Sequence, residues 1–136
     1  MTQSMTQPLF SGVIPPAPTL FTAEGEFNET AQAILIEHLI DSPVDGLFFL
    51  GSAGEFAHMS REMRQDVATF CTRLVAGRKP VLIGIASCGT QETIEAGLHA
   101  QRIGADGVVV VNPWYNPLSE SNLFQHFKRV AEALSI

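Results

Sequence analysis

The sequence is poor in the features that mark several classes of protein. Its 8 lysines and arginines are outnumbered by 14 acids, giving a formal net charge of −6, which argues against nucleic acid or an anionic membrane surface as the main partner. It also lacks the run of about 18 apolar residues that a membrane span requires. The opening stretch, MTQSMTQPLF, has neither the basic start nor the apolar core of a secretory signal. We therefore expect a cytoplasmic protein without a membrane partner.

Cysteine and metal-ligand patterns are equally sparse. The two cysteines, Cys71 and Cys88, are 17 residues apart and form no C-x-x-C pair, so a disulfide framework or a zinc site is not expected. Cys88 follows an apolar run, where a small loop residue is favoured over a reactive thiol. The histidines have no ligand spacing, so we interpret them as surface or capping residues: His38, His58, His99 and His126. No phosphate-binding glycine motif is present.

The sequence contains the same pattern of segments four times. Each repeat has an apolar run, a loop of small or polar residues, and an amphipathic stretch. The last three runs have no polar alternation, which is typical of strands buried on both faces of a parallel sheet. The four runs are GVIPPAPTLF (12–21), DGLFFL (45–50), PVLIGIA (80–86) and DGVVVV (106–111).

The stretches between the runs have helical periodicity and plausible starts. One predicted apolar face comprises Met63, Val67, Phe70, Cys71 and Leu74, and another comprises Leu123, Phe124, Phe127, Val130, Ala131 and Leu134. Residues that cap helix N-termini well are followed within two positions by an acid, which favours the positive end of a helix. These predicted caps are Asn28, Ser60, Thr90 and Ser119.

The pattern predicts a (βα)4 arrangement, the N-terminal half of a (β/α)8 TIM barrel. A full barrel needs about 250 residues, and this chain has 136. We expect residues 1–9 to form a tail and residues 10–136 to form a partial barrel domain. The alternative is a flavodoxin-like sheet, which is complete at about this length.

Two loops follow predicted strands and therefore lie where parallel α/β folds bind ligands. GSAGE (51–55) offers glycines that permit close backbone approach, exposed N–H groups that can hold a carboxylate, and the Ser52 hydroxyl. By the residues alone, a tight turn is at least as good an interpretation. VNPWYNP (111–117) places Trp114 and Tyr115 at the same end, where a phenol can move a proton or the aromatics can pack at an interface.

Together these segments resemble a known family. GVIPPAPTLFTAEGEFN, DGLFFLGSAGEF, PVLIGIA and GADGVVVVNPWYNP, followed by a helix ending in HFKRVAEA, are similar in order and spacing to the dihydrodipicolinate synthase / N-acetylneuraminate lyase family. The resemblance covers residues 12–134. Within the family, the IPP opening and the GSxGE motif are most similar to 2-keto-3-deoxygluconate aldolases.

The resemblance implies class I aldolase chemistry in a TIM-barrel oligomer. A lysine forms a Schiff base with pyruvate or another 2-keto acid, and neither a metal nor an organic cofactor is needed. Ser52 matches the hydroxyl of the proton-relay triad. Ser52 and Ala53, with Gly54 beside them, match the segment that binds the carboxylate, and Ala53 replaces a common hydroxyl residue. Tyr115 matches a catalytic tyrosine that crosses the tight dimer, and Trp114 matches a dimer-contact aromatic.

The family's covalent machinery has no counterpart in this chain. In the family, the second triad tyrosine lies on the fifth strand and the Schiff-base lysine on the sixth, beyond the position that Ile136 matches. The chain has two lysines, Lys79 and Lys128. The first precedes the third apolar run, at the end of the barrel away from the site, and the second lies among polar positions of a helix. We expect neither to be the nucleophile.

These observations lead to two functional hypotheses. The first is a truncated aldolase or lyase for pyruvate and 2-keto-3-deoxy sugar acids, or for a dihydrodipicolinate synthase-like condensation, that is inactive alone. The second is a non-catalytic fragment that associates with itself or with a full-length relative through the Trp114–Tyr115 loop. Half a barrel has two open sheet edges, so two copies pairing edge to edge would approximate a closed barrel. Both hypotheses predict a homo-oligomer or a related complex.

Overall fold

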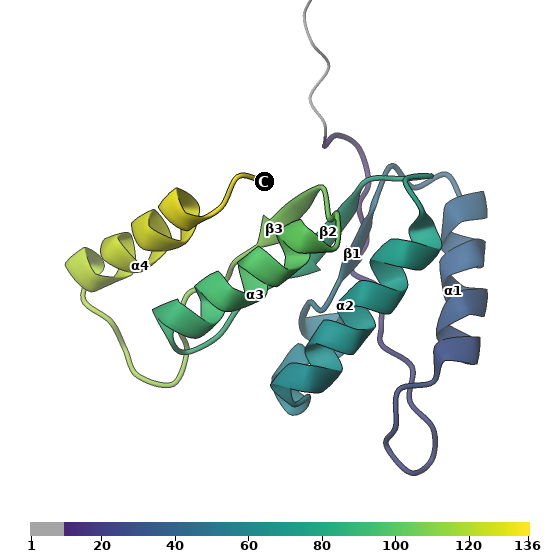
Figure 1. The fold of residues 1–136 in the computed structure, drawn as a ribbon, viewed down its shortest axis with the longest axis horizontal. Helices are drawn as coiled ribbons and strands as arrows, with labels where there is room; N and C mark the ends of the chain where they lie inside the picture. Colours follow the sequence, from purple (N-terminus) through teal and green to yellow (C-terminus); the bar gives the residue numbers. More distant parts are fainter. Residues whose placement is uncertain (1–9) are drawn as a thin grey trace, which may run out of the picture.

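Three parallel strands form the centre of the computed structural model, which describes residues 10–136 (Figure 1). They are β1 (Leu47–Phe49), β2 (Val81–Gly84) and β3 (Gly107–Val109), and they lie in that order across the sheet. Phe48 is opposite Leu82, and Ile83 is opposite Val108. Three of the four predicted strands are thus confirmed, each shorter than its apolar run. The predicted tail, residues 1–9, lies outside the described residues.

The first apolar run is the exception, because it forms two isolated bridges instead of a strand, the second of them between Phe21 and Phe27. Pro16 pairs in parallel with Phe48, and the Ala17 N–H donates to the Phe48 carbonyl at 2.8 Å. The strand predicted over 12–21 is therefore wrong in extent, although the run does lie alongside β1. The reason is local, since Pro15, Pro16 and Pro18 have no N–H to contribute to a ladder.

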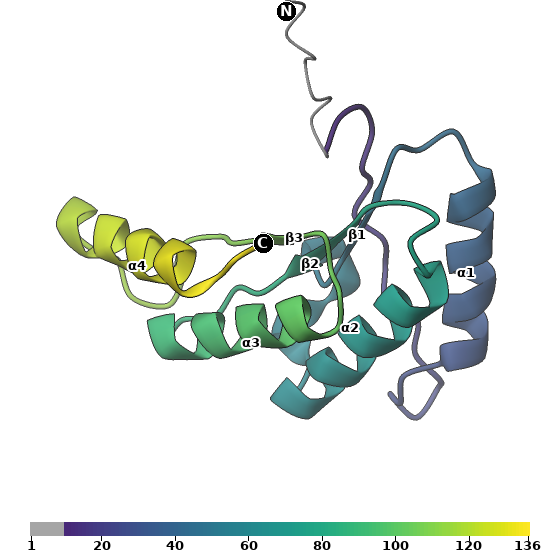
Figure 2. The same ribbon diagram turned by 45° about the horizontal axis from the view of Figure 1, so that its top comes forward.

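Four helices follow in chain order on one side of this sheet, with α4 beside α3 and beyond the strands (Figures 1 and 2). They are α1 (Glu29–Asp41), α2 (Arg61–Val75), α3 (Thr90–Arg102) and α4 (Glu120–Ala133). The predicted caps Asn28, Ser60 and Ser119 are confirmed, since each side chain accepts a first-turn N–H. The prediction for Thr90 is wrong: Gly89 is the cap residue, and the Thr90 hydroxyl contacts His126 Nδ1 at 2.9 Å instead.

The core lies between the sheet and the first three helices. Its largest fully buried apolar side chains are Phe49, Ile36, Leu47, Val67, Val75 and Cys71. The predicted face of α2 is confirmed, with Val67 and Cys71 buried. On the predicted face of α4, only Val130 is buried, while Phe124 is 64% exposed. His126 of α4 is buried, so its interpretation as a surface or capping residue is wrong.

Candidate active site

The candidate site begins where β1 ends, at a turn that needs unusual backbone geometry. Leu50 adopts the left-handed region, with φ of 58°, although its side chain is buried in the core. The next residue, Gly51, has ordinary dihedrals but no room for a side chain: an added Cβ would lie 2.8 Å from the Phe48 ring. A side chain at Gly51 would therefore require the Phe48 ring to shift.

The turn leaves two backbone donors unoccupied. Residues Ser52–Gly54 form a single 3-10 turn, η1. The Gly54 N–H donates to the Gly51 carbonyl at 3.0 Å, and the Glu55 N–H donates to the Ser52 carbonyl at 3.1 Å. Within residues 10–136, no protein acceptor takes the N–H of Ser52 or Ala53. Adjacent free N–H groups of this kind can together hold an anion such as a carboxylate.

Gly54 is buried and helps to hold the turn. Its carbonyl accepts a hydrogen bond from the Thr19 hydroxyl at 2.8 Å, and Thr19 is itself buried. A Cβ at Gly54 would meet the Ala17 carbonyl and the Thr19 hydroxyl, both at 3.3 Å. Because the Gly54 N–H is already bonded to Gly51, its predicted contact with substrate stays a prediction.

Thr19 and Gln32 position the turn after β1, and the sequence analysis does not predict this role for either residue. Gln32 of α1 is fully buried; its side chain accepts from the Leu20 N–H at 2.9 Å and donates to the Pro18 carbonyl at 3.2 Å. These bonds fix the segment that carries Thr19, and Thr19 in turn fixes Gly54. The one signal in the sequence is the polar residue Gln32 within the apolar stretch AQAILI. Its role cannot be inferred until the segment that it contacts is known.

The aromatic loop after β3 contacts the turn after β1, as the shared strand-end position predicts. The Trp114 ring meets Phe56 edge-on, with centroids 5.6 Å apart and an interplanar angle of 86°. Phe56 belongs to a second 3-10 turn, η2 (Phe56–His58), directly after the GSAGE segment. Trp114 remains 49% exposed and Tyr115 82% exposed. The structure thus brings Trp114 to this end of the sheet and leaves the Tyr115 phenol pointing into solvent.

Neither lysine lies at this end of the sheet. Lys79 precedes β2, at the amino ends of the strands, and its Nζ donates to the carbonyls of Ser42 and Val44. Lys128 lies on α4, where its Nζ is 3.8 Å from a Glu132 carboxylate oxygen. Both amines are therefore occupied away from Ser52. That neither lysine is the nucleophile stays a prediction.

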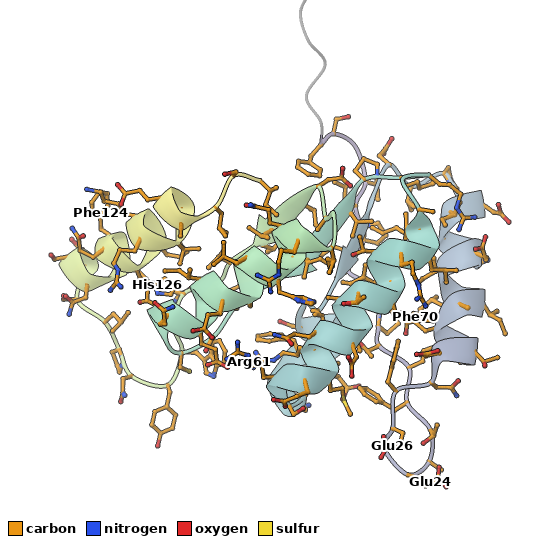
Figure 3. The ribbon with its side chains drawn as sticks, in the orientation of Figure 1. Glu24, Glu26, Arg61, Phe70, Phe124 and His126 are labelled. Carbon is orange, nitrogen blue, oxygen red and sulfur yellow. The ribbon has the colours of Figure 1, made fainter. Side chains whose placement is uncertain are left out.

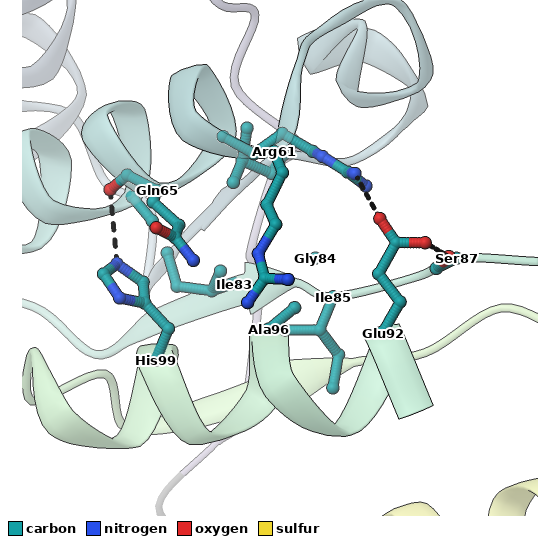
Figure 4. A pocket seen from close by; sticks show the side chains of 12 residues that line it. Arg61, Gln65, Ile83, Gly84, Ile85, Ser87, Glu92, Ala96 and His99 are labelled. Carbon is teal, nitrogen blue, oxygen red and sulfur yellow. Dashed lines mark hydrogen bonds and ion pairs between the residues drawn. The ribbon is translucent and has the colours of Figure 1, made fainter. Parts of the chain in front are cut away.

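A small cavity between α2 and α3 lies behind the site (Figure 4). Its volume is about 30 Å³, roughly that of one water molecule, so it is too small for a keto acid. At its rim, Arg64 contacts Glu92 at 3.0 Å and Ser87 donates to the same carboxylate. The Ser87 hydrogen bond, with help from Arg64, holds the pKa of Glu92 below its ordinary value. This rim ties the loop after β2 to α2.

Residues 10–136 contain neither a metal-binding cluster nor a membrane-spanning helix. No cluster of three or more His, Cys, Asp or Glu side chains is arranged to hold a metal ion. No helix in this part of the chain combines the length and apolar character needed to cross a bilayer.

Comparison with known proteins identifies the same family that the sequence motifs resemble, over nearly the whole chain. The Dihydrodipicolinate synthetase family matches residues 9–136. The chain is 48% identical over 128 residues to the putative 2-dehydro-3-deoxy-D-gluconate aldolase YagE of Escherichia coli, covering 94% of this chain and 42% of YagE. It is 39% identical to the probable 2-dehydro-3-deoxy-D-pentonate aldolase YjhH of the same organism, covering 93% of this chain and 42% of YjhH.

Solved structures agree with these matches. A crystal structure of YagE in complex with pyruvate superposes with a TM-score of 0.91 at 49% identity, covering 93% of this chain and 43% of that one. A putative dihydrodipicolinate synthetase from Pseudomonas aeruginosa also gives 0.91, at 33% identity, covering 93% of this chain and 44% of that one. The flavodoxin-like alternative is therefore wrong. The chain spans less than half the length of these relatives.

Proposed function

Since this chain belongs to the dihydrodipicolinate synthetase family, we propose that it supplies the carboxylate-binding half of a pyruvate-dependent aldolase site. The observation that carries the proposal is that the Ser52 and Ala53 N–H groups, at the carboxyl end of β1, have no acceptor within residues 10–136. A substrate carboxylate would accept from both. The Ser52 hydroxyl, which is exposed beside them, would relay a proton.

The proposed substrates are pyruvate and 2-keto-3-deoxy sugar acids. The names of YagE and YjhH support this class, and pyruvate is bound in the YagE structure. Ala53 has no hydroxyl, so binding at that position rests on its backbone N–H. Tyr115, 82% exposed, is proposed to act across an interface with a partner chain. No cofactor is proposed, and a cytoplasmic location remains a prediction.

The covalent step requires residues that these 136 positions do not supply. Schiff-base formation needs a desolvated lysine with a lowered pKa, whereas Lys79 holds two carbonyls and Lys128 is half exposed. We expect the chain to bind a keto acid weakly and to leave it unreacted. Treatment with pyruvate and borohydride, followed by intact mass, should return the unmodified 14.7 kDa chain. A single specific adduct would contradict this part of the proposal.

Binding is tested separately by removing one N–H. Ala53 and Ala57 are each the middle residue of a 3-10 turn, η1 and η2 respectively. Ala53→Pro deletes a proposed carboxylate donor, and Ala57→Pro is the matched control. In amide NMR, pyruvate should shift the Ser52 and Ala53 signals of the unsubstituted chain. The response at Ser52 should fall about tenfold in Ala53→Pro, consistent with loss of a charge-assisted bond of about 1.5 kcal/mol, and persist in Ala57→Pro.

The observed exposure also favours the second function, association with another chain. Trp114, Tyr115 and Phe124 are 49%, 82% and 64% exposed, and exposed aromatics of this kind are enriched at protein interfaces. We propose that the Trp114–Tyr115 loop contacts a second copy or a full-length relative. Light scattering after gel filtration should show an oligomer that Tyr115→Ser weakens. A monomer at all concentrations, with no complex upon addition of YagE, would contradict association.

A further inference from the structure

A second pocket lies between α3 and α4, apart from the GSAGE turn. It has a volume of about 270 Å³, near the lower limit for small-molecule sites. Its polar lining comes from the loop after β2, the start of α3 and one side of α4: Cys88, Thr90, Asn122, Gln125, His126 and Arg129. Pro113 and Leu118 complete the wall. Neither proposed function uses this space.

The pocket contains an unsatisfied buried group. His126 is only 3% exposed, and its Nδ1 contacts the Thr90 hydroxyl at 2.9 Å. Its Nε2 is buried and has no hydrogen-bond partner within residues 10–136. Burial of such an atom is costly unless something pairs with it. Figure 3 shows His126 on the side of α4 that faces α3, while Phe124 points the other way.

The pocket is lined by one positively charged side chain and by the positive end of a helix. Arg129 is the one charged residue in the lining, and no carboxylate lies within 4.0 Å of its guanidinium among residues 10–136. α3 starts at this pocket, because Thr90 is both its first residue and a lining residue. Its cap residue, Gly89, provides no side-chain acceptor, so first-turn N–H groups stay available at the positive end of the helix.

The nearest acid on α3 does not neutralise this site. Glu92 is in the first turn of the helix, but its carboxylate is bonded to Arg64 and Ser87 at the rim of the cavity between α2 and α3. The α4 side of the α3 start therefore keeps its donors. A free guanidinium, a helix N-terminus and side-chain amides together are donors that suit an oxyanion.

We propose that this pocket binds a small oxyanion, a phosphate or a carboxylate group, between the start of α3 and Arg129. Binding selects the His126 tautomer in which the Thr90 hydroxyl donates to Nδ1 and Nε2 carries the hydrogen. The Asn122 and Gln125 amides lie in the same wall and supply further donors. The bound anion would link α3 to α4, and the proposal is independent of the aldolase site.

Cys88 provides the readout, since it is exposed and lines the pocket. Cys71 is buried, and burial raises the pKa of its thiol to about 12, so it serves as an unreactive internal control. The rate of Cys88 alkylation by iodoacetamide is measured by intact mass, in inorganic phosphate, in acetate, and in sodium chloride of equal ionic strength. We expect phosphate to slow alkylation at least threefold relative to chloride. Slowing by acetate alone would identify the ligand as a carboxylate and still support the site.

Arg129→Ala should abolish the protection, whereas Lys128→Ala, which removes the same charge from the next residue, should preserve it. Equal protection in Arg129→Ala, or none by either anion in the unsubstituted chain, would overturn the proposal. Amide NMR provides a measurement that requires no variant. Anion binding should shift the Thr90 and Gln91 N–H signals at the start of α3, and unchanged signals in both anions would equally overturn it.

Discussion

α2 and α4 have similar amphipathic patterns, yet only α2 buries its apolar face. On α2, Val67, Cys71 and Val75 are at most 1% exposed. On α4, Phe124 and Phe127 are 64% and 38% exposed, and burial is confined to His126 and Val130. α2 contacts helices on both sides, α1 and α3, whereas α4 packs mainly against α3. An apolar stripe therefore indicates which face of a helix can be buried; whether it is buried depends on its neighbours.

The largest expected effect compares the same substitution in the core and on α4. Phe49→Ala in β1 removes a ring that is 1% exposed and should lower the free energy of unfolding by about 3–5 kcal/mol. Phe124→Ala removes a ring that is 64% exposed and should change it by less than about 0.5 kcal/mol. Urea titration measures both. A large loss in Phe124→Ala would mean that another molecule covers α4 in solution.

Glycine substitutions sharpen the comparison. A Cβ at Gly84 in β2 would lie 2.0 Å from the Leu50 carbonyl oxygen, which is backbone in the rigid core, so Gly84→Ala should cost about 1–3 kcal/mol or more. A Cβ at Gly97 in α3 would lie 3.1 Å from the Cδ1 of Ile85 and 2.6 Å from a methyl of Leu134, just beyond α4. That side chain is flexible, and alanine gains up to about 1 kcal/mol of helix propensity. Gly97→Ala should therefore be near neutral in thermal unfolding.

The contact between α3 and α4 should respond to pH through His126. Burial lowers the pKa of His126 below its ordinary value of 6.5, so below that pH the unfolded chain takes up a proton that the folded chain resists. The contribution of His126 to stability is complete above pH 6.5 and is lost as the pH falls through its folded-state pKa. His126→Gln should flatten this part of the stability–pH curve. His58→Gln, with a side chain 79% exposed, is the control, and an unchanged slope in His126→Gln would contradict the assignment.

The smallest expected effects concern two ion pairs between α2 and α3. The Arg64 side chain is 21% exposed and bonds both Glu92 and the Ala86 carbonyl, so Arg64→Ala should cost about 1 kcal/mol. Arg61, 51% exposed and paired with Glu95 at 2.7 Å, should contribute less, about 0–0.5 kcal/mol. Urea titration at low and high salt separates them, because the more exposed pair should be screened more strongly. Equal losses would show that exposure does not rank these contacts.

Much of the fold was predictable because its signals are local. Continuous apolar runs identified β1, β2 and β3, and side-chain caps placed three helix starts at Asn28, Ser60 and Ser119. The wrong predictions concern interactions that the sequence of a single segment does not reveal. Prolines limit the first run to a single bridge to β1, and Thr90 contacts His126, 36 residues away, instead of capping α3.

For the candidate site, the sequence alone determined that glycine and small residues end β1 at Ser52–Gly54 and that aromatic residues follow β3. The sequence also shows that the chain has two lysines and that neither directly follows a strand. Only the tertiary structure decided that, within residues 10–136, the Ser52 and Ala53 N–H groups stay free, that buried Thr19 and Gln32 hold the turn, and that the His126 Nε2 atom has no partner. The physical reason is that hydrogen-bond satisfaction and burial depend on segments distant in the chain, which periodicity and spacing do not record.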